Sequence, residues 1–157
     1  MDEEDAPPRF PRVAAIVGCM TAQELVDRFG RSNADERFQT LRLLVPGEAD
    51  SPVLGPFLLA TAQDVAEDDL VRVEAIRAIP LLDFADPDLV VTCREALFRL
   101  AGEDEDWDVR NAAGCAVFDL PGAEVSIEPM RALLAAEPEE FVRENVSGAL
   151  RLFLRRR

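Results

Sequence analysis

One short pattern occurs three times along the chain and limits what the chain can fold into. Each copy has acidic residues, then Val-Arg, then apolar residues at helical spacing, as in DDLVRVEAIRAIPLL, DWDVRNAAGCAVFDL and EFVRENVSGALRLFL. A weaker copy, ADERFQTLRLLVP, precedes them, so that Arg37, Arg72, Arg110 and Arg143 follow one another at intervals of 35, 38 and 33 residues. A fixed period of this length indicates a repeat architecture, in which each unit buries its apolar face against its neighbours.

Each repeat is predicted to hold two helices. Segments with helical periodicity over 54–65, 87–100 and 127–136 lie between the copies of the pattern, and Thr21-Ala-Gln-Glu24 has the form of a capping box at the start of a further helix. We therefore expect an all-α fold, a right-handed α-solenoid of about four helical hairpins with no β-sheet. The expected organisation is an acidic, Pro-rich flexible tail followed by one repeat domain: tail 1–12, domain 13–157, repeats at about 20–46, 51–83, 86–121 and 124–156.

Composition removes several classes of function. The net charge is -14, which opposes binding to nucleic acid through its phosphates, and the chain has neither His nor Tyr, the usual proton-transfer side chains. Cys19, Cys93 and Cys115 are too widely spaced for a disulfide framework or a zinc site. No apolar stretch is long enough to span a membrane, and the acidic start is unlike a signal peptide, so we expect a cytoplasmic protein.

The repeated pattern over residues 20–156 resembles the HEAT-repeat family, in particular the short bacterial, PBS-lyase-like HEAT repeats. The resemblance implies a ladder between neighbouring repeats, formed by the arginine of the second helix and an acidic residue just before that helix. The matching acidic positions are Asp68, Asp106 and Glu139, each four residues before its arginine. Repeat one departs from the pattern, with Asn33 at the acidic position and Glu36-Arg37 in place of Val-Arg, as an end-capping repeat does.

The second helices are expected to line the concave side of the array. Helical rotation places the core on a stripe such as Val109, Ala113, Ala116, Val117 and Leu120, and the opposite stripe on that concave side. The predicted binding residues on it are Phe38, Arg42, Val73, Arg77, Asn111, Phe118, Glu144 and Arg151. Apolar residues mixed with arginines are typical of protein interfaces. A small change in helix rotation would instead bury Phe38 or Phe118 between repeats.

A second candidate surface is the acidic edge formed by the turns within the repeats. Carboxylates before a helix cap its amide groups, but one or two suffice, whereas Glu103 to Asp108 contains five acidic residues around the only tryptophan. We include Asp104, Asp106, Trp107 and Asp108 among the predicted partner-binding residues, with Trp107 alternatively a lid on the repeat junction. An EF-hand reading of Asp104-x-Asp106-x-Asp108 fails, because Val109 stands where the loop needs glycine.

We assign no catalytic, cofactor or metal-binding residues. The expected function is a non-enzymatic protein–protein interaction module, and more narrowly an acidic inhibitor or immunity-type protein that binds a basic partner protein, with no nucleic acid and no membrane. The alternative is a HEAT-type lyase or enzyme accessory whose groove holds a small ligand or a modified protein, with Cys115, Arg77 or Arg110 contributing chemistry. The protein itself is expected to be a monomer or a weak homodimer.

Overall fold

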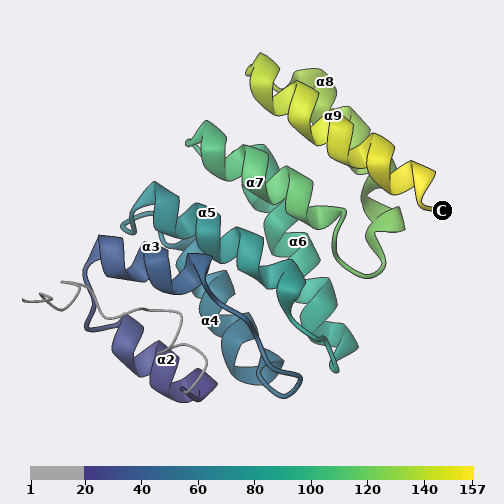
Figure 1. Cartoon of the computed structure of the whole chain (residues 1–157). Helices are drawn as coiled ribbons and strands as arrows, with labels where there is room; N and C mark the ends of the chain where they lie inside the picture. Colours follow the sequence, from purple (N-terminus) through teal and green to yellow (C-terminus); the bar gives the residue numbers. More distant parts are fainter. Residues whose placement is uncertain (1–19) are drawn as a thin grey trace, which may run out of the picture.

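A computed structural model describes residues 20–157, and the predicted tail over 1–12, like Cys19, lies outside these residues. The described chain consists of four helical hairpins and two short 3-10 turns (Figure 1). We call the first helix of each hairpin the A helix and the second the B helix. The A helices are α2 (Ala22–Phe29), α4 (Ser51–Gln63), α6 (Pro87–Glu103) and α8 (Ile127–Ala136); the B helices are α3 (Ala34–Arg42), α5 (Asp69–Ala78), α7 (Trp107–Val117) and α9 (Glu140–Arg155). The 3-10 turns are η1 (Ile79–Leu81) and η2 (Ala123–Ser126).

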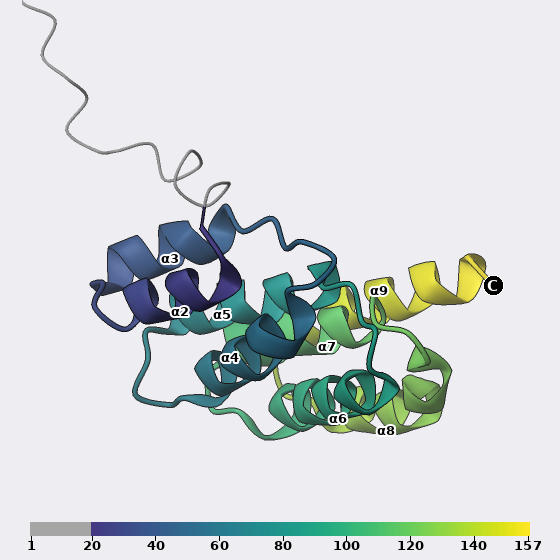
Figure 2. The same ribbon diagram turned by 90° about the horizontal axis from the view of Figure 1, so that it is seen from below.

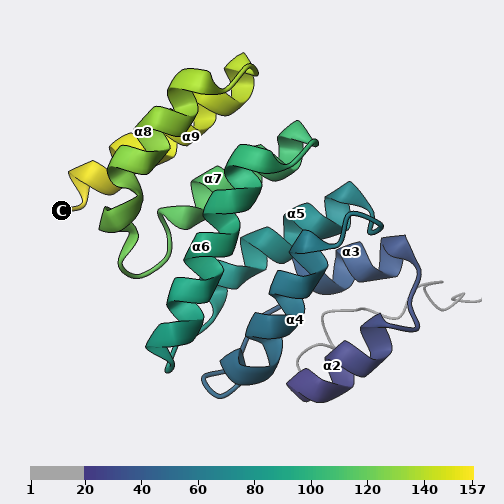
Figure 3. The ribbon, with the colours of Figure 1, turned by 180° about the vertical axis from the view of Figure 1, so that it is seen from behind.

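The helices form two layers. The B helices lie side by side in the order α3, α5, α7, α9, and the A helices form a parallel row behind them, as the view from behind shows (Figure 3). Residues 20–157 contain no strand. The predicted all-α solenoid of helical hairpins is therefore confirmed.

Side-chain caps explain where several helices begin. The predicted capping box is present: the Thr21 hydroxyl accepts from the amide of Glu24 at 3.2 Å, and the Glu24 carboxylate accepts from the amide of Thr21 at 2.8 Å. Asn33 and Glu36 form a second capping box at the start of α3. Asp68, Asp86 and Asp106 cap α5, α6 and α7 with their carboxylates. Each such cap contributes about 1 kcal/mol to helix stability.

One continuous core runs between the two layers. The predicted core stripe of α7, from Val109 to Leu120, is buried throughout, and Val142, Val146 and Leu150 are buried in α9.

Two glycines allow the close approach of successive repeats. A Cβ atom at Gly55 would lie 2.8 Å from a methyl of Leu89, and one at Gly114 would lie 2.8 Å from a methyl of Val146. The tight stacking of α4 on α6 and of α7 on α9 therefore depends on residues without side chains.

Candidate functional site

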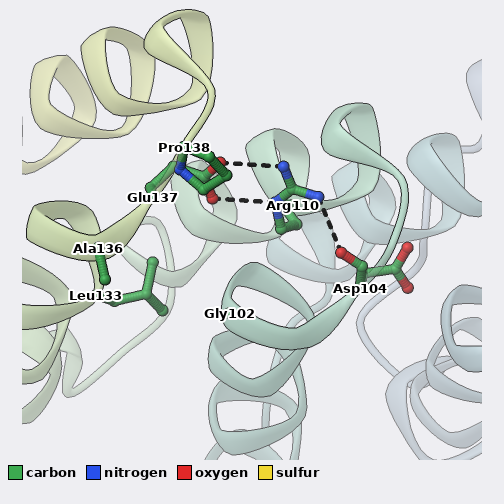
Figure 4. Close-up of a pocket in the computed structure, with 7 residues that line it drawn as sticks. All are labelled: Gly102, Asp104, Arg110, Leu133, Ala136, Glu137 and Pro138. Carbon is green, nitrogen blue, oxygen red and sulfur yellow. Dashed lines mark hydrogen bonds and ion pairs between the residues drawn. The ribbon is translucent and has the colours of Figure 1, made fainter.

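A ladder of arginine–carboxylate pairs joins each repeat to the next. Arg37 in α3 donates to Glu67 at 2.8 Å, and Arg72 in α5 forms two contacts with the carboxylate of Asp104. Arg110 in α7 donates to both oxygens of Glu137, each at 3.0 Å (Figure 4). In every case the carboxylate comes from the turn of the following repeat.

These three arginines, and Arg143 in α9, also bind the end of the A helix in their own repeat. Nε of Arg37 donates to the carbonyl of Phe29, and Nε of Arg72 donates to the carbonyl of Ala62, both at 3.1 Å. Arg110 and Arg143 reach the equivalent carbonyls, for example the one of Asp104 at 2.9 Å. These carbonyls have no partner within the helix, so each arginine satisfies a helix end as well as a neighbouring repeat.

The acidic members of the ladder are not those that the resemblance implied. Asp68 and Asp106 use their carboxylates to accept from amides of their own B helix, and the Glu139 carboxylate makes no hydrogen bond within residues 20–157. The residue that faces the preceding repeat stands one or two positions earlier in the turn: Asp104 and Glu137 directly follow the A helix, and Glu67 directly precedes Asp68. The acidic rungs are therefore Glu67, Asp104 and Glu137.

The ladder removes two residues from the list of candidates for binding and chemistry. The Asp104 side chain is only 7% exposed and is occupied by Arg72, so the prediction that it contacts a partner is wrong. Arg110, proposed for chemistry in the alternative function, is occupied by Glu137 and two carbonyls. Burial alone would raise the pKa of Glu137, but hydrogen bonds from Arg110 and from the amide of Glu139 hold this pKa below its ordinary value.

The predicted concave surface is smaller than expected. Val73 is 5% exposed because α5 lies between α3 and α7, and Phe118 is 4% exposed because it packs on Phe153, with ring centres 5.5 Å apart. Neither can contact a partner, so both predictions are wrong. Phe38 and Asn111 are half-buried, whereas Arg42, Arg77, Glu144 and Arg151 are exposed.

A hollow of about 380 Å³ remains on this side, between the end of α5 and α7. Its polar lining comes from Arg77, Asn111, Cys115 and Asp119. Burial and the neighbouring Asp119 raise the pKa of the Cys115 thiol, although Arg77 opposes the shift. The thiol is thus kept in its unreactive protonated form, which argues against nucleophilic chemistry in this hollow.

An exposed aromatic pair stands on the edge where the turns within the repeats line up. Trp107 is the first residue of α7 and is 42% exposed, and Phe141, the second residue of α9, is 51% exposed. Their rings meet edge to face, with centres 5.4 Å apart. The pair bridges the junction of repeats three and four and keeps part of its apolar surface exposed. It belongs to the edge where α5, α7 and α9 begin, and Figure 1 shows these helix starts side by side.

The acidic residues on this edge divide into two groups. Members of the first group pair with arginines, cap helices or accept from an amide of their own turn: Asp64, Glu67, Asp68, Asp69, Asp104, Asp106 and Glu137. The second group consists of Glu103, Glu105, Asp108, Glu139 and Glu140, whose carboxylates make no hydrogen bond or ion pair within residues 20–157. We call these five carboxylates, together with Trp107 and Phe141, the aromatic–acidic edge.

Between the turns of repeats two and three, further carboxylates converge. Desolvation raises the pKa of Asp69, and the neighbouring Asp106 carboxylate adds to the shift, while Arg72 opposes it. These groups line a hollow of about 440 Å³ with Val65 and Glu103 to Asp106. Within the described residues, no three His, Cys, Asp or Glu side chains are arranged to hold a metal ion. Arg72 is the only basic side chain among the residues that line this hollow, against five carboxylates, so the charge at this place is net negative.

Stacked helical hairpins joined by an arginine–carboxylate ladder define a helical repeat array. A family model described as HEAT repeats matches residues 55–151, more than half of the chain, and the protein belongs to the HEAT-repeat family. No curated protein and no solved structure matches the chain. HEAT-repeat arrays are in general non-enzymatic scaffolds that bind other proteins. None of the helices over 20–157 is long and apolar enough to cross a membrane.

Proposed function

We propose that this HEAT-repeat protein binds a basic protein partner, without catalysis of its own, through the aromatic–acidic edge. The observation that carries the proposal is the set of five carboxylates that have no partner within the described residues and that surround the exposed Trp107–Phe141 pair. The two aromatic rings supply apolar contact area of the kind that anchors interfaces, and tryptophan is enriched at such anchors. Lys and Arg side chains of a partner would neutralise the surplus charge.

The charge of the edge supports a role in rapid binding. A field of one sign speeds the diffusional encounter of a protein with an oppositely charged partner, and it mainly raises the association rate constant. A small acidic protein that must block a basic enzyme or toxin benefits most from this property. We therefore keep the inhibitor or immunity-type role as the narrower proposal. We place it in the cytoplasm, where free thiols such as Cys93 and Cys115 persist.

Affinity capture with matched variants tests the edge. The bait is the full chain, compared with a Glu103→Gln/Glu105→Gln/Asp108→Asn variant and with a Trp107→Ser variant. The control variant, Asp35→Asn/Asp83→Asn/Glu124→Gln, removes the same number of exposed acidic residues elsewhere. We expect one basic protein to bind the wild type and the control but neither edge variant, and its retention to fall as salt is raised. Equal retention by all four baits would exclude the edge as the binding surface.

The inhibitor role has its own readout. Once the basic partner is identified, its activity is measured with increasing amounts of the wild-type chain and of the Trp107→Ser variant. Loss of the partner's activity at a one-to-one ratio with the wild type only would support the inhibitor role. A partner that stays fully active in the complex would reduce the proposal to that of an adaptor.

The hollow between α5 and α7 supports the second candidate, a groove for a small ligand or a modified protein. The Oδ1 atom of Asn111 is buried there and has no hydrogen-bond partner within the described residues, so it could accept a hydrogen bond from a ligand in the hollow. A small molecule that co-purifies with the wild type and is lost in an Asn111→Leu variant would favour this function. A wild-type mass spectrum free of any retained small molecule would count against it.

A further inference from the structure

Helix α9 ends the row of B helices, and one of its long sides has no covering element within residues 20–157. Val142, Val146 and Leu150 are buried where α9 packs on α7 and α8. Figures 1 and 2 show α9 at the outer end of the stack. The residues on the opposite side, at helical spacing of three and four, are Glu140, Phe141, Glu144, Gly148, Arg151, Leu152 and Arg155.

The charges on this side are sorted by sign along the helix. The first half carries Glu140 and Glu144, and the second half carries Arg151 and Arg155, none of which forms an ion pair within the described chain. The helix dipole favours acidic residues in the first turn and basic residues in the last turn only. It therefore accounts for Glu140 and Arg155 but not for Glu144 and Arg151, which lie further inside the helix.

Gly148 stands near the middle of the same side. A glycine weakens a helix interior, and at Gly55 and Gly114 the cost is explained by tight packing. At Gly148 a Cβ atom would meet only the guanidinium of Arg151, at 3.9 Å, so the contacts within the described chain do not require glycine. Because Gly148 has no side chain, a second helix can approach the backbone of α9 closely at this position.

We propose that two copies of this protein pair through α9, antiparallel, about a two-fold axis that passes between Ser147 and Gly148. Residues at equal distances before and after the axis then face each other. Glu144 of one copy meets Arg151 of the second, and Glu140 meets Arg155. Each pair occurs twice, as in every interface with two-fold symmetry.

Apolar contact adds to these ion pairs. Phe141 is 51% exposed and Leu152 is 52% exposed. Both lie on the same flank of this side of α9 and at similar distances on either side of the proposed axis, so Phe141 of one copy comes close to Leu152 of the second. A helix of 16 residues is about 24 Å long. A single pair of such helices buries less than the roughly 1,200 Å² of a standard stable interface, so the dimer forms and dissociates with concentration.

A second copy fits this side better than a head-to-tail continuation of the stack. In a continued stack, Arg143 would need a carboxylate from the turn of the next unit, as Arg37, Arg72 and Arg110 have. In the other repeats that carboxylate stands five or six residues before the arginine of the B helix. Repeat one has Arg31 and Ser32 at these positions before Arg37, so it has no carboxylate there to pair with Arg143. The antiparallel arrangement instead matches opposite charges of α9 with each other. Because this dimer covers Phe141 and Glu140, a second copy and a basic partner would compete for that end of the aromatic–acidic edge.

Sedimentation velocity on the purified full chain, from about 10 µM to about 1 mM, tests the dimer over the range expected for a small interface. We expect the weight-average mass to rise from that of the monomer toward twice that value. Glu144→Arg and Arg151→Glu variants each place like charges across the axis, and each should weaken association about tenfold. The Glu144→Arg/Arg151→Glu double variant restores opposite charges in the two-fold arrangement and should recover association.

Matched controls separate the interface from net charge and folding. Glu95→Arg and Arg31→Glu change the net charge by the same amounts at exposed positions away from α9, and both should associate like the wild type. Circular dichroism shows whether each variant remains helical. A wild-type chain that stays monomeric over the whole series would overturn the proposal, as would a double variant no better than either single one. The test needs only the purified chain, so its result is independent of the basic partner.

Discussion

Arg110 donates two parallel hydrogen bonds to Glu137, each of 3.0 Å, and thereby ties repeat three to repeat four (Figure 4). The Arg110 side chain is 11% exposed and that of Glu137 is 3% exposed, so removal of the Glu137 carboxylate would leave Arg110 a largely buried charge without an ion-pair partner. We expect Glu137→Ala to lower the free energy of unfolding by about 3 kcal/mol. The measurement is urea unfolding followed by circular dichroism.

The exposed pair Arg131–Glu128 on α8 provides the control for that measurement. Both side chains are more than half exposed, so water screens their attraction. Glu128→Ala should cost less than about 1 kcal/mol. An equal loss of stability in the two variants would show that the ladder contributes no more than an ordinary surface ion pair.

Acid should weaken the same contact in a defined direction. The pKa of Glu137 in the folded chain lies below its ordinary value of 4.5, because Arg110 and the amide of Glu139 bind the ionised form. The stability from this shift is complete above the unfolded pKa and is lost as the pH falls through the folded pKa. The difference in unfolding free energy between wild type and Glu137→Gln should therefore be largest near pH 7 and shrink below about pH 4.5. A difference that is constant with pH would contradict the shift.

Two glycines in B helices should respond in opposite ways to the same substitution. Gly114→Ala places a methyl 2.8 Å from Val146 in the contact of α7 with α9, and should destabilise the fold by about 1–3 kcal/mol. Gly148→Ala meets only the end of the Arg151 side chain, at 3.9 Å, and gains helix propensity, so it should stabilise the monomer by about 0.5–1 kcal/mol. Thermal unfolding at low protein concentration measures both. Similar effects of the same sign would show that α7 and α9 relax around the added methyl.

The fold was predictable from the sequence because it depends on the period at which a pattern recurs along the chain. The site was predictable only in part, because it depends on how neighbouring carboxylates are oriented within one turn. The spacing of Arg72, Arg110 and Arg143 was enough to indicate stacked hairpins. The carboxylate that faces the neighbouring repeat stands five residues before Arg72 but six residues before Arg110 and Arg143, and spacing alone does not determine this position. Asp106 caps α7, so Asp104 is the one left to bind Arg72.

The prediction that Val73 and Phe118 are accessible on the concave side was wrong for a related reason. Helical rotation gives the direction of a side chain relative to its own helix but not the distance to the neighbouring one. Val73 and Phe118 lie on the predicted stripe, yet α5 is flanked on both sides and Phe118 reaches Phe153. The signal for the aromatic–acidic edge was present in the excess of carboxylates around Trp107. Which of them are free became clear only from their hydrogen bonds.

The only tryptophan provides a direct test of the potential at the aromatic–acidic edge. Trp107 is 42% exposed, and Glu105 stands two residues before it and Asp108 directly after it, both with carboxylates unpaired within residues 20–157. A negative potential repels iodide and attracts caesium, so caesium should quench the fluorescence of Trp107 more efficiently, after correction for the intrinsic efficiency of each ion with free indole. The difference should shrink as ionic strength rises toward about 1 M, where the Debye length falls to about 3 Å.

The edge variant makes this prediction specific. Glu103→Gln/Glu105→Gln/Asp108→Asn removes three negative charges near the indole, so iodide quenching should rise and caesium quenching should fall. The Asp35→Asn/Asp83→Asn/Glu124→Gln control removes the same charge at a distance and should behave like the wild type. If iodide and caesium quench the wild type and the edge variant alike, the carboxylates exert no field at Trp107. The edge would then lack the electrostatic attraction on which recognition of a basic partner depends.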